Sequence, residues 1–329
     1  MTLLLTDQEV RGLSSAEALV EAIRRGYEVE ARGGAELPDR VNLTASPGFF
    51  RLMPAIVPGC DVMGFKVFNQ VSAGGVQYLV GLCDEKTGAL LSLMDAAFLT
   101  AARTGATTGV AASYLAPDGV AEVGVIGSGQ EAEANLAGVC AVLPVTRIKV
   151  FSPNAERRRA FAARVSERLD LEAIAVEEPS DAARSPVVVV ATFTGFDTGR
   201  IALKGEWLRP GTCVLSIGST MPNLRELDTT VIARADLVVC DAPEQARTES
   251  GDMIAADEAS LLDGRLISLA DLVVGSNVPD LNGEAIRVFK SVGTGLQDLI
   301  AAKAIYDRAL AAGVGTAKDL LTTKTPTGA

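Results

Sequence analysis

The sequence contains no histidine among its 329 residues. This absence excludes catalytic Ser–His–Asp and Cys–His systems, HExxH zinc sites and every imidazole general base. Proton transfer near neutral pH must therefore depend on lysine, aspartate, glutamate, tyrosine, cysteine or water. No other feature of the composition narrows the possible chemistry as much.

Cysteines and long apolar runs are also scarce. The five cysteines are separated by at least 23 residues, so they form no CxxC pair for a metal or a redox reaction. Their odd number is typical of reduced thiols in the cytosol. No apolar run approaches the about 18 residues of a membrane-spanning helix, and the first ten residues carry acids where a signal peptide has basic residues. We expect a cytoplasmic protein without a metal site.

Positive charge is the minority charge. The chain has 30 lysines and arginines against 41 aspartates and glutamates, which gives a formal charge of −11. The electrostatic field of a chain with this negative charge repels polyanions, so neither nucleic acid nor an anionic membrane is an expected partner. The hydrophobic fraction of 48% and the charged fraction of 22% are those of an ordinary globular protein. The length favours two domains.

The first 116 residues are predicted to mix helices and strands. A capping box at residues 14–17 begins a helix that ends at Gly33-Gly34. Short apolar segments predict strands at residues 49–53, 63–68 and 76–83. Residues 95–115, rich in alanine and threonine, predict a helix that leads to a domain boundary at Pro117.

Beyond Pro117, buried strands alternate with helices. Strands are predicted at residues 120–126, 148–151, 187–192, 213–217 and 237–240, and helices at residues 130–143, 155–168 and 297–312. Runs of β-branched residues separated by helices are typical of a parallel sheet covered on both faces. The sequence therefore predicts an α/β doubly wound domain at residues 117–296.

A glycine-rich turn follows the first of these strands. Residues 127–132 read Gly-Ser-Gly-Gln-Glu-Ala and fit the pattern GxGxxA between a strand and a helix, as in dinucleotide-binding domains. Gly127 permits the tight turn, Gly129 lets backbone amides approach a pyrophosphate, and Ala132 allows close packing. A structural turn without a ligand is the alternative. The predicted cofactor contacts here are Gly127, Ser128, Gly129, Gln130, Glu131 and Ala132.

The end of the second strand bears on the choice of dinucleotide. NAD sites usually place an acid there to hold the ribose 2′-hydroxyl. This sequence has Ser152 and Asn154 instead, followed by Glu156 and three arginines that begin at Arg157. The missing acid and the arginines favour NADP over NAD, with Ser152, Asn154 and Arg157 as contacts. Glu156 argues against this, and the arginines could equally form a solvated helix face.

Four basic residues of the first part stand among apolar or small neighbours: Arg40, Arg51, Lys66 and Arg103. A cation in such surroundings costs desolvation free energy unless it meets an anion. That anion could come from the protein, as an internal salt bridge, or it could be the carboxylate of a substrate. A surface position is the third option, and composition alone does not choose among them.

Motifs along most of the chain resemble the ornithine cyclodeaminase/μ-crystallin family. The matching segments are residues 38–40, 65–67, 100–104, the GxGxxA turn, and residues 218–228, 249–252 and 289–293. They follow in order within residues 5 to 308. The resemblance implies a Rossmann doubly wound parallel sheet at residues 117–296 that binds NAD or NADP. It also implies a second α+β domain, formed by residues 1–116 with 297–329, which binds the substrate and forms a homodimer.

The same resemblance implies roles for individual residues. The family's basic positions that match Arg40, Lys66 and Arg103 hold a substrate carboxylate near the nicotinamide. Further matching residues are expected to line the cofactor or the cleft: Thr192, Thr220, Lys290, Ser291 and Gly293.

Two departures from the family pattern bear on the reaction. Cyclodeaminases place an aspartate where this sequence has Thr220, and a threonine cannot act as a base near neutral pH. The resemblance is therefore closer to the ketimine reductase branch, which has a hydroxyl residue there. The family usually reads Gln-Ala where this sequence has Glu131-Ala132, so contacts near the phosphates are expected to differ.

The expected function is an NAD(P)H-dependent imine or ketimine reductase of the amino-acid dehydrogenase type. It would reduce a small 2-imino acid, such as iminosuccinate or a cyclic ketimine, to the L-amino acid. The catalytic candidates are Lys66, Arg103 and Thr220. Lys66 would relay the proton, with a pKa lowered by Arg40 and Arg103, while Thr220 would position a water.

Other interpretations of the sequence stay open. Arg51 could hold a second carboxylate of a dicarboxylic imine or could be an exposed cation, and Asp228 and Glu249 are candidate electrostatic partners. The reaction could also be the deaminating cyclisation of ornithine, without net consumption of cofactor. A third alternative is a non-catalytic NADP-dependent binding protein like μ-crystallin.

Overall fold

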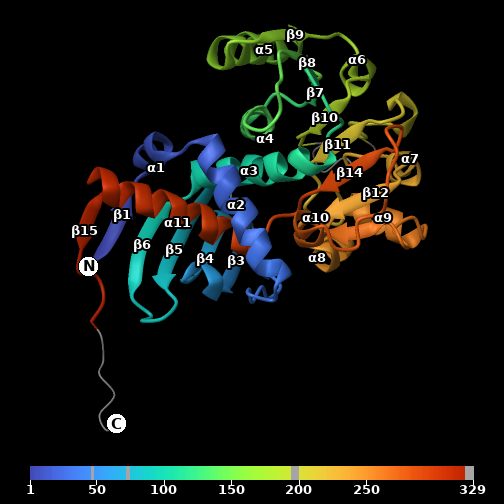
Figure 1. The fold of residues 1–329 in the computed structure, drawn as a ribbon. Helices are drawn as coiled ribbons and strands as arrows, with labels where there is room; N and C mark the ends of the chain where they lie inside the picture. Colours follow the sequence, from blue (N-terminus) through green and yellow to red (C-terminus); the bar gives the residue numbers. More distant parts are fainter. Residues whose placement is uncertain (46–47, 72–74, 194–199, 323–329) are drawn as a thin grey trace.

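Two β-sheets, connected by the long helix α3 (Ala97–Leu115), organise the chain (Figure 1). The computed structural model describes residues 1–45, 48–71, 75–193 and 200–322. The sequence also predicts a short polar tail at residues 322–329, which lies almost wholly outside the described residues. None of the helices in the described part of the chain is long and apolar enough to cross a membrane.

The first sheet has seven strands in the order β15-β1-β6-β5-β4-β3-β2. All neighbours are antiparallel except β1 and β6, which run parallel. The strands predicted at residues 49–53, 63–68 and 76–83 are present and longer than expected. The bounds are β1 (Thr2–Leu5), β2 (Val41–Ala45), β3 (Gly48–Val57), β4 (Val62–Val71), β5 (Val76–Asp84), β6 (Leu90–Asp95) and β15 (Thr316–Lys318).

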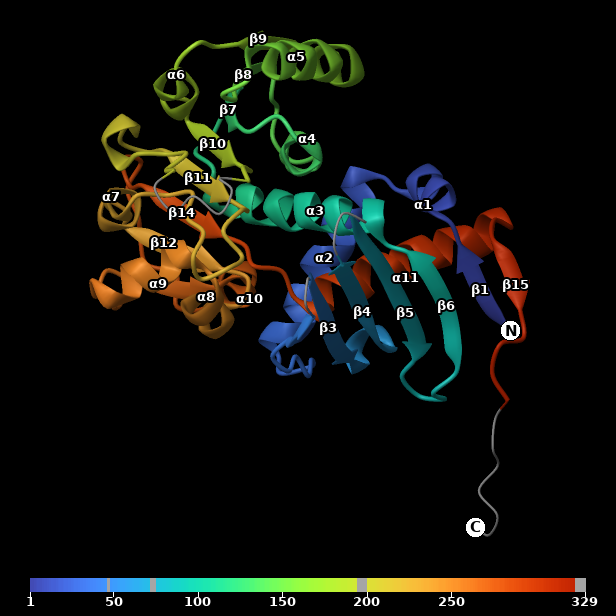
Figure 2. The same ribbon diagram turned by 180° about the vertical axis from the view of Figure 1, so that it is seen from behind.

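Helices cover one face of this sheet. Helix α11 (Gly295–Ala312) packs on β3, β4 and β5, and α2 (Ala16–Ala31) lies against α11, while α1 (Asp7–Leu13) lies near the edge. Helix α2 is capped by Ser15, whose hydroxyl accepts from the Ala18 amide, so the predicted capping box one residue earlier was wrong. Figure 2 shows the opposite face of the sheet, which no helix of the described chain covers.

The second sheet has eight parallel strands in the order β13-β12-β14-β11-β10-β7-β8-β9. The five strands at one end of the sheet, in the order β9-β8-β7-β10-β11, are arranged as in a Rossmann fold, so the predicted α/β class with a doubly wound parallel sheet is confirmed. The bounds are β7 (Glu122–Ile126), β8 (Arg147–Phe151), β9 (Glu172–Ala175), β10 (Val187–Val190), β11 (Cys213–Ser216), β12 (Leu237–Cys240), β13 (Leu266–Ser268) and β14 (Arg287–Lys290).

Helices on both faces bury these strands. Strand β10 consists of four valines, all fully buried, because side chains on each face of a parallel sheet meet a helix layer. The helices are α4 (Gln130–Cys140), α5 (Ala155–Leu169), α6 (Pro179–Ala183), α7 (Thr229–Ala233), α8 (Pro243–Glu249), α9 (Gly251–Glu258) and α10 (Leu269–Val274). Two short 3-10 turns lie at Pro58–Cys60 and Gly205–Trp207.

Helices α3 and α4 join the two halves through backbone contact. A Cβ atom added to Gly138 of α4 would lie 1.8 Å from the carbonyl oxygen of Gly105 in α3, and one added to Gly105 would lie 2.1 Å from that of Ala134. The hydroxyl of Thr108 also donates to Asn135 Oδ1 at 2.5 Å. Only glycine allows this approach, so these small residues fix how the two sheets are placed.

Candidate active site

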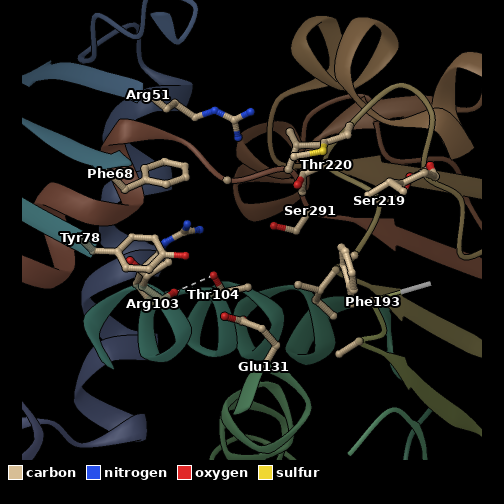
Figure 3. Close-up of a pocket in the computed structure, with 18 of the residues that line it drawn as sticks. Arg51, Phe68, Tyr78, Arg103, Thr104, Glu131, Phe193, Ser219, Thr220 and Ser291 are labelled. Carbon is tan, nitrogen blue, oxygen red and sulfur yellow. Dashed lines mark hydrogen bonds between the residues drawn. The ribbon is translucent and has the colours of Figure 1, made fainter. Parts of the chain in front are cut away.

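A cavity of about 550 Å³ lies between the two sheets, where the carboxyl ends of the parallel strands face β3, β4 and β5 (Figure 3). In doubly wound folds ligands bind at this edge of the sheet. The three walls come from different parts of the chain. The first sheet contributes Arg51, Phe68 and Tyr78, helices α3 and α4 contribute Arg103, Thr104 and Glu131, and the strand-end loops contribute Phe193, Ser219, Thr220 and Ser291.

The register of the first sheet places two cations on the cavity side. Asn42, Arg51, Phe68 and Tyr78 lie opposite one another across four strands, and side chains that are paired in this way share one face. Lys66 lies two residues before Phe68 on β4, so it faces the same way in the next row. The alternation of Lys66 with apolar neighbours thus reflects a strand with one face toward the cavity.

Lys66 and Arg103 share a single buried carboxylate. The Lys66 ammonium lies 2.9 Å from Asp298 Oδ1 and 2.8 Å from Oδ2, and Arg103 Nε lies 2.9 Å from Oδ1. Arg103 Nη1 also donates to Gln297 Oε1 at 2.5 Å. All three charged side chains are almost completely buried. Two cations with one anion leave one positive charge in excess.

The environment of Lys66 changes its acidity. Burial, the nearby guanidinium of Arg103 and, more weakly, that of Arg40 lower its pKa to about 7. The Asp298 carboxylate opposes this but does not cancel it. Lys66 therefore exchanges a proton near neutral pH, in agreement with the lowered pKa predicted for it. In this protein without histidine it supplies a group that titrates in the range of an imidazole.

Arg40 forms the second cationic group with Arg51. Its Nε lies 2.9 Å from Glu249 Oε2, and its Nη2 donates to the carbonyl oxygens of Val292 and Gly293 at 2.8 and 3.1 Å. Burial lowers the pKa of Arg40 to about 10, against the opposing effect of Glu249. Arg40 remains charged at neutral pH and anchors the loop after β14.

That loop is also organised by Asp241, which follows β12. Its carboxylate accepts hydrogen bonds from the amides of Val292 and Gly293, from the Ser291 hydroxyl and from Gln297 Nε2. Gln297 in turn donates to the buried Tyr27 hydroxyl at 2.8 Å. This network connects the parallel sheet with α11, so Ser291 and Gly293 are fixed at the cavity edge by a residue that the sequence analysis did not single out.

The glycine-rich turn has the geometry that a dinucleotide requires. Gly127 has a φ of 129°, and a Cβ atom there would lie 2.2 Å from the carbonyl oxygen of Ala191. Gly129 begins α4 and lines the cavity, and a Cβ atom there would meet nothing within 4 Å. No side chain within the described residues caps α4, so its first amides are free to bind a phosphate. These residues fit a pyrophosphate.

Glu131, in the first turn of α4, points into the cavity below Thr104 (Figure 3). It is open to the cavity but enclosed by protein on the other sides, and this desolvation raises its pKa, against the pull of Arg103 and Lys66. The side chain is therefore held between the glycine turn and the cationic groups.

The end of β8 carries hydroxyl and amide groups. The Ser128 hydroxyl donates to Ser152 Oγ at 2.9 Å, and Asn154 caps α5 by accepting from the Arg157 amide. Arg158 is buried and bonds the Ser152 carbonyl and Glu177, whereas Arg157 is exposed and forms no ion pair within the described residues. Arg159 is exposed as well, but its guanidinium lies 3.8 Å from Glu177, so Arg157 is the arginine of this run without an acidic partner in the described chain.

A buried ionic cluster lies behind the loops that follow β10 and β11. Lys290 donates to Ser216 Oγ and the Gly218 carbonyl, and its ammonium lies 3.3 Å from Asp252 and 3.8 Å from Glu226. Glu226 accepts from both the amide and the hydroxyl of Thr192, at 2.6 and 2.7 Å. Burial raises the pKa of Glu226. The cluster fixes the loops from which Thr192 and Thr220 face the cavity.

Comparison with known proteins agrees with this geometry. The model of the ornithine cyclodeaminase/mu-crystallin family matches residues 1–313. The chain belongs to this family. The expectation from the seven motifs is thereby confirmed.

Solved structures of family-like enzymes superpose over almost the whole chain. The Delta(1)-pyrroline-2-carboxylate reductase of Thermococcus litoralis, in complex with NADH and L-proline, has a TM-score of 0.89 and 33% identity, covering 96% of this chain and 100% of that one. An archaeal alanine dehydrogenase dimer with bound NAD has a TM-score of 0.89 and 28% identity, covering 97% and 99%. The iminosuccinate reductase of Paracoccus denitrificans in complex with NAD+ has a TM-score of 0.88 and 25% identity, covering 96% and 98%.

Most of the residues predicted from the family motifs meet in the one cavity. Those at its surface are Arg40, Arg51, Lys66, Arg103, Gly129, Gln130, Glu131, Thr192, Thr220, Ser291 and Gly293. Gly127, Ser128 and Ala132 lie in the adjoining turn, and Ser152, Asn154 and Arg157 lie beyond the end of β8. The sequence thus predicted residues from both sides of the site.

Two expectations need correction. Lys290 does not line the cavity, because the buried ionic cluster takes up its ammonium, so a direct contact with the cofactor is replaced by support of the loops. Asp228 caps α7 through the Val231 amide and also accepts from the Gly205 amide, so it is no partner of the cavity cations. Glu249, by contrast, pairs with Arg40 as considered.

Asp298 and the aromatic wall of Phe68 and Tyr78 were not predicted from the sequence. Asp298 is the acid that makes buried Lys66 and Arg103 possible, and it lies in the first turn of α11 where every neighbouring position is buried. An acidic residue inside an otherwise apolar helix segment is the signal that would have indicated an internal partner for the cations.

Proposed function

We propose that the protein reduces a small 2-imino acid to the amino acid with NADPH or NADH. The observation that carries this proposal is the composition of the cavity. Two cations, Lys66 and Arg103, share the single carboxylate of Asp298 there, next to a glycine-rich turn whose geometry fits a dinucleotide. The family members named above, which act on imino or amino acids with NAD or NADH, support it.

Lys66 and Arg103, which together carry the excess positive charge, form the binding site for the substrate carboxylate. Arg103 presents a planar guanidinium whose Nε is already held by Asp298, and Lys66 adds a second donor beside it. A carboxylate bound there has its adjacent C=N carbon held in one orientation, which converts a random encounter into a positioned one. The aromatic wall of Phe68 and Tyr78 keeps water away from this side.

Reduction of the C=N bond needs a hydride and a protonated nitrogen. A nicotinamide dinucleotide, when bound, supplies the hydride to the imine carbon. The imine must be in its iminium form, because the positive nitrogen becomes neutral as the new C–H bond forms. Lys66, with a pKa of about 7, can hold a proton for that nitrogen and recover it from solvent afterwards. Thr220 faces the same cavity and can hold a water by its hydroxyl.

Residues Gly127 to Ala132 hold the pyrophosphate in this proposal, and the end of β8 holds the adenosine ribose. No acid is present at residues 152–155, and Arg157 is available, so we infer a preference for NADPH over NADH. A neutral substitution, Arg157→Met, would then raise the KM for NADPH and leave that for NADH nearly unchanged.

The test is the oxidation of NADPH and of NADH, followed at 340 nm, with pyruvate plus ammonia, oxaloacetate plus ammonia, and cyclic ketimines. We expect turnover with at least one imine. Release of ammonia from ornithine without net use of cofactor would instead indicate a cyclodeaminase, and cofactor binding without any turnover would indicate a binding protein. Either result would overturn the proposal.

The rate should depend on pH through Lys66. Since the protonated ammonium binds the carboxylate and holds the proton for the nitrogen, kcat/KM is expected to fall as the pH rises through about 7. Rates measured from pH 5.5 to 9.5 at a constant concentration of free iminium would show this decrease of kcat/KM. A flat profile over that range would contradict the role of Lys66.

We also propose two domains with separate tasks. Residues 1–116 with 297–329, of which 323–329 lie outside the described residues, would bind the substrate and form a homodimer. Residues 117–296 would bind the dinucleotide. The uncovered face of the seven-stranded sheet supports dimerisation, because it exposes large apolar side chains from neighbouring strands: Val41, Leu43, Phe50, Ile56 and Leu79.

Charge placed on this face should separate the dimer. The double variant Phe50→Glu/Leu79→Glu adds like charges to both copies, so light scattering should give a mass near the 34.1 kDa of one chain instead of about twice that value. Leu310→Glu is the control, because Leu310 is exposed on α11 away from the sheet's free face. A wild-type mass of one chain would refute the dimer.

A further inference from the structure

Arg51 differs from the other cavity cations in having no acid of its own. Its Nε donates to Asn42 Oδ1 at 2.5 Å, and within the described residues its two terminal nitrogens make no hydrogen bond. The guanidinium lies 5.3 Å from the ring centre of Phe68 and 5.8 Å from that of Phe49. Figure 3 shows it extended into the cavity toward Thr220. Asn42 and the two rings fix a guanidinium whose donors face open space.

The charges of the cavity fall into two groups with the same balance. Lys66 and Arg103 share Asp298. Glu249 forms an ion pair with Arg40, and its charge also acts on Arg51. The charge of Asp241 also acts on Arg40, but its carboxylate accepts hydrogen bonds from the loop after β14 and from Gln297, so each group has two cations and one carboxylate in ion-pair contact. The remaining acid, Glu131, lies on α4 at the glycine turn, across the cavity from Arg51.

We propose that Arg51 binds a second carboxylate of the substrate, so that the enzyme acts on a dicarboxylic 2-imino acid. This inference rests on the proposed reduction of 2-imino acids. The first carboxylate neutralises the excess charge of Lys66 and Arg103, and the second neutralises that of Arg40 and Arg51. A dianion matches two separate excess charges, whereas a monocarboxylate leaves a partly buried arginine without an anion.

The geometry of the sheet agrees with one small ligand between these groups. Arg51 pairs with Phe68 across β3 and β4, and Lys66 lies two residues before Phe68, so the two cations are diagonal neighbours. Diagonal neighbours have Cβ atoms about 7–8 Å apart. Both side chains are long enough to reach the two ends of a four- or five-carbon diacid from there.

The reaction balances without a further reagent. A 2-oxo diacid and an ammonium ion condense with loss of one water to give the 2-imino diacid in its iminium form, C=NH2+. One hydride from the reduced dinucleotide forms the C–H bond, the C=N π electrons become the nitrogen lone pair, and a proton from solvent completes the ammonium. The products are the oxidised dinucleotide and an acidic amino acid.

Substrate preference tests the proposal directly. With ammonia in excess, wild-type kcat/KM should be at least 100-fold higher for oxaloacetate or 2-oxoglutarate than for pyruvate. Arg51→Met should lower the value for the diacid about 100-fold more than that for pyruvate, mainly through KM, and Arg51→Lys should recover part of the loss. Arg25→Met, at an exposed arginine paired with Glu21, is the control.

A binding measurement separates this proposal from the reaction itself. Calorimetry with the enzyme and reduced dinucleotide should show succinate bound about 100-fold more tightly than butyrate, and Arg51→Met should remove the difference. Equal binding of both acids, or a preference of the wild type for the pyruvate imine, would refute the second-carboxylate site while the reductase stands. Arg51-dependent binding of succinate without reduction of any imine would refute the reductase and keep the site.

Discussion

Replacing Lys66 with methionine should lower kcat/KM for the imine by about 10³-fold, because one residue supplies both a donor to the carboxylate and the proton held for the nitrogen. Methionine has a similar length and keeps the apolar contact with Phe68, over which the ammonium lies at 5.3 Å. The kcat should fall as well as the KM rise. Steady-state kinetics with a saturating dinucleotide would measure both.

The same variant is expected to fold well. Without Lys66, the carboxylate of Asp298 and the guanidinium of Arg103 form a one-to-one pair. In the wild type the pKa of Lys66 is lowered from 10.5 to about 7, so its charged form costs folding free energy below pH 7. Wild-type stability should therefore gain as the pH rises from 7 toward 10.5, and the variant should lack this gain.

Thermal unfolding of both proteins at several pH values would check this difference. Lys303→Met is the matched control, since Lys303 is a partly exposed lysine paired with Asp307 on the surface of α11. A loss of activity in Lys66→Met of less than tenfold would refute the catalytic role, whatever the stability measurements show.

Asp298→Asn is expected to be the most destabilising conservative change in the cavity. Asparagine keeps the shape but leaves Lys66 and Arg103 buried together without an anion, and such a loss costs about 3 kcal/mol or more in unfolding free energy. The loss should be smaller at high pH, because Lys66 can release its proton. Urea unfolding at pH 6 and pH 9 would show this.

The pH profile of this variant gives a second measurement. The Asp298 carboxylate stabilises the ammonium of Lys66 against the effect of burial, so its removal should lower the pKa of Lys66 below about 7. The decrease of kcat/KM with rising pH should then occur at lower pH. Asp307→Asn, at the exposed acid on the same helix, should change neither property. An unchanged pH dependence in Asp298→Asn would mean that a group other than Lys66 sets it.

The parallel sheet could be predicted from the sequence because its strands are buried on both faces. An unbroken apolar run, such as the four valines at residues 187–190 or the segment at 213–216, would expose apolar side chains on a half-exposed strand. Such runs therefore predict central strands of a parallel sheet. Seven strands were not predicted: β1, β2, β6, β9, β13, β14 and β15. Five of them have only three or four residues, which carry too little periodicity to be distinguished from a loop, whereas β2 and β6 have five and six.

The cationic cavity could be predicted only in part. Isolated charges among apolar neighbours indicated that Lys66 and Arg103 need an anion, but the partner Asp298 lies 232 residues from one and 195 from the other. Contacts over such separations depend on the completed fold. For the same reason the sequence left Arg51 undecided between surface and site, whereas the pairing of β3 with β4 places it beside Phe68.

The touching backbones of α3 and α4 have a consequence for how this enzyme can change. Arg103 and the glycine turn are carried by one pair of helices whose spacing is set when the chain folds. The spacing between Arg103 and the glycine turn therefore needs no hinge to create it. Side chains on β3 to β5 can be replaced one at a time without disturbing that spacing. Evolution could therefore adapt the cavity to other 2-imino acids by substitutions on β3 to β5, while Arg103 and the glycine turn stay in place.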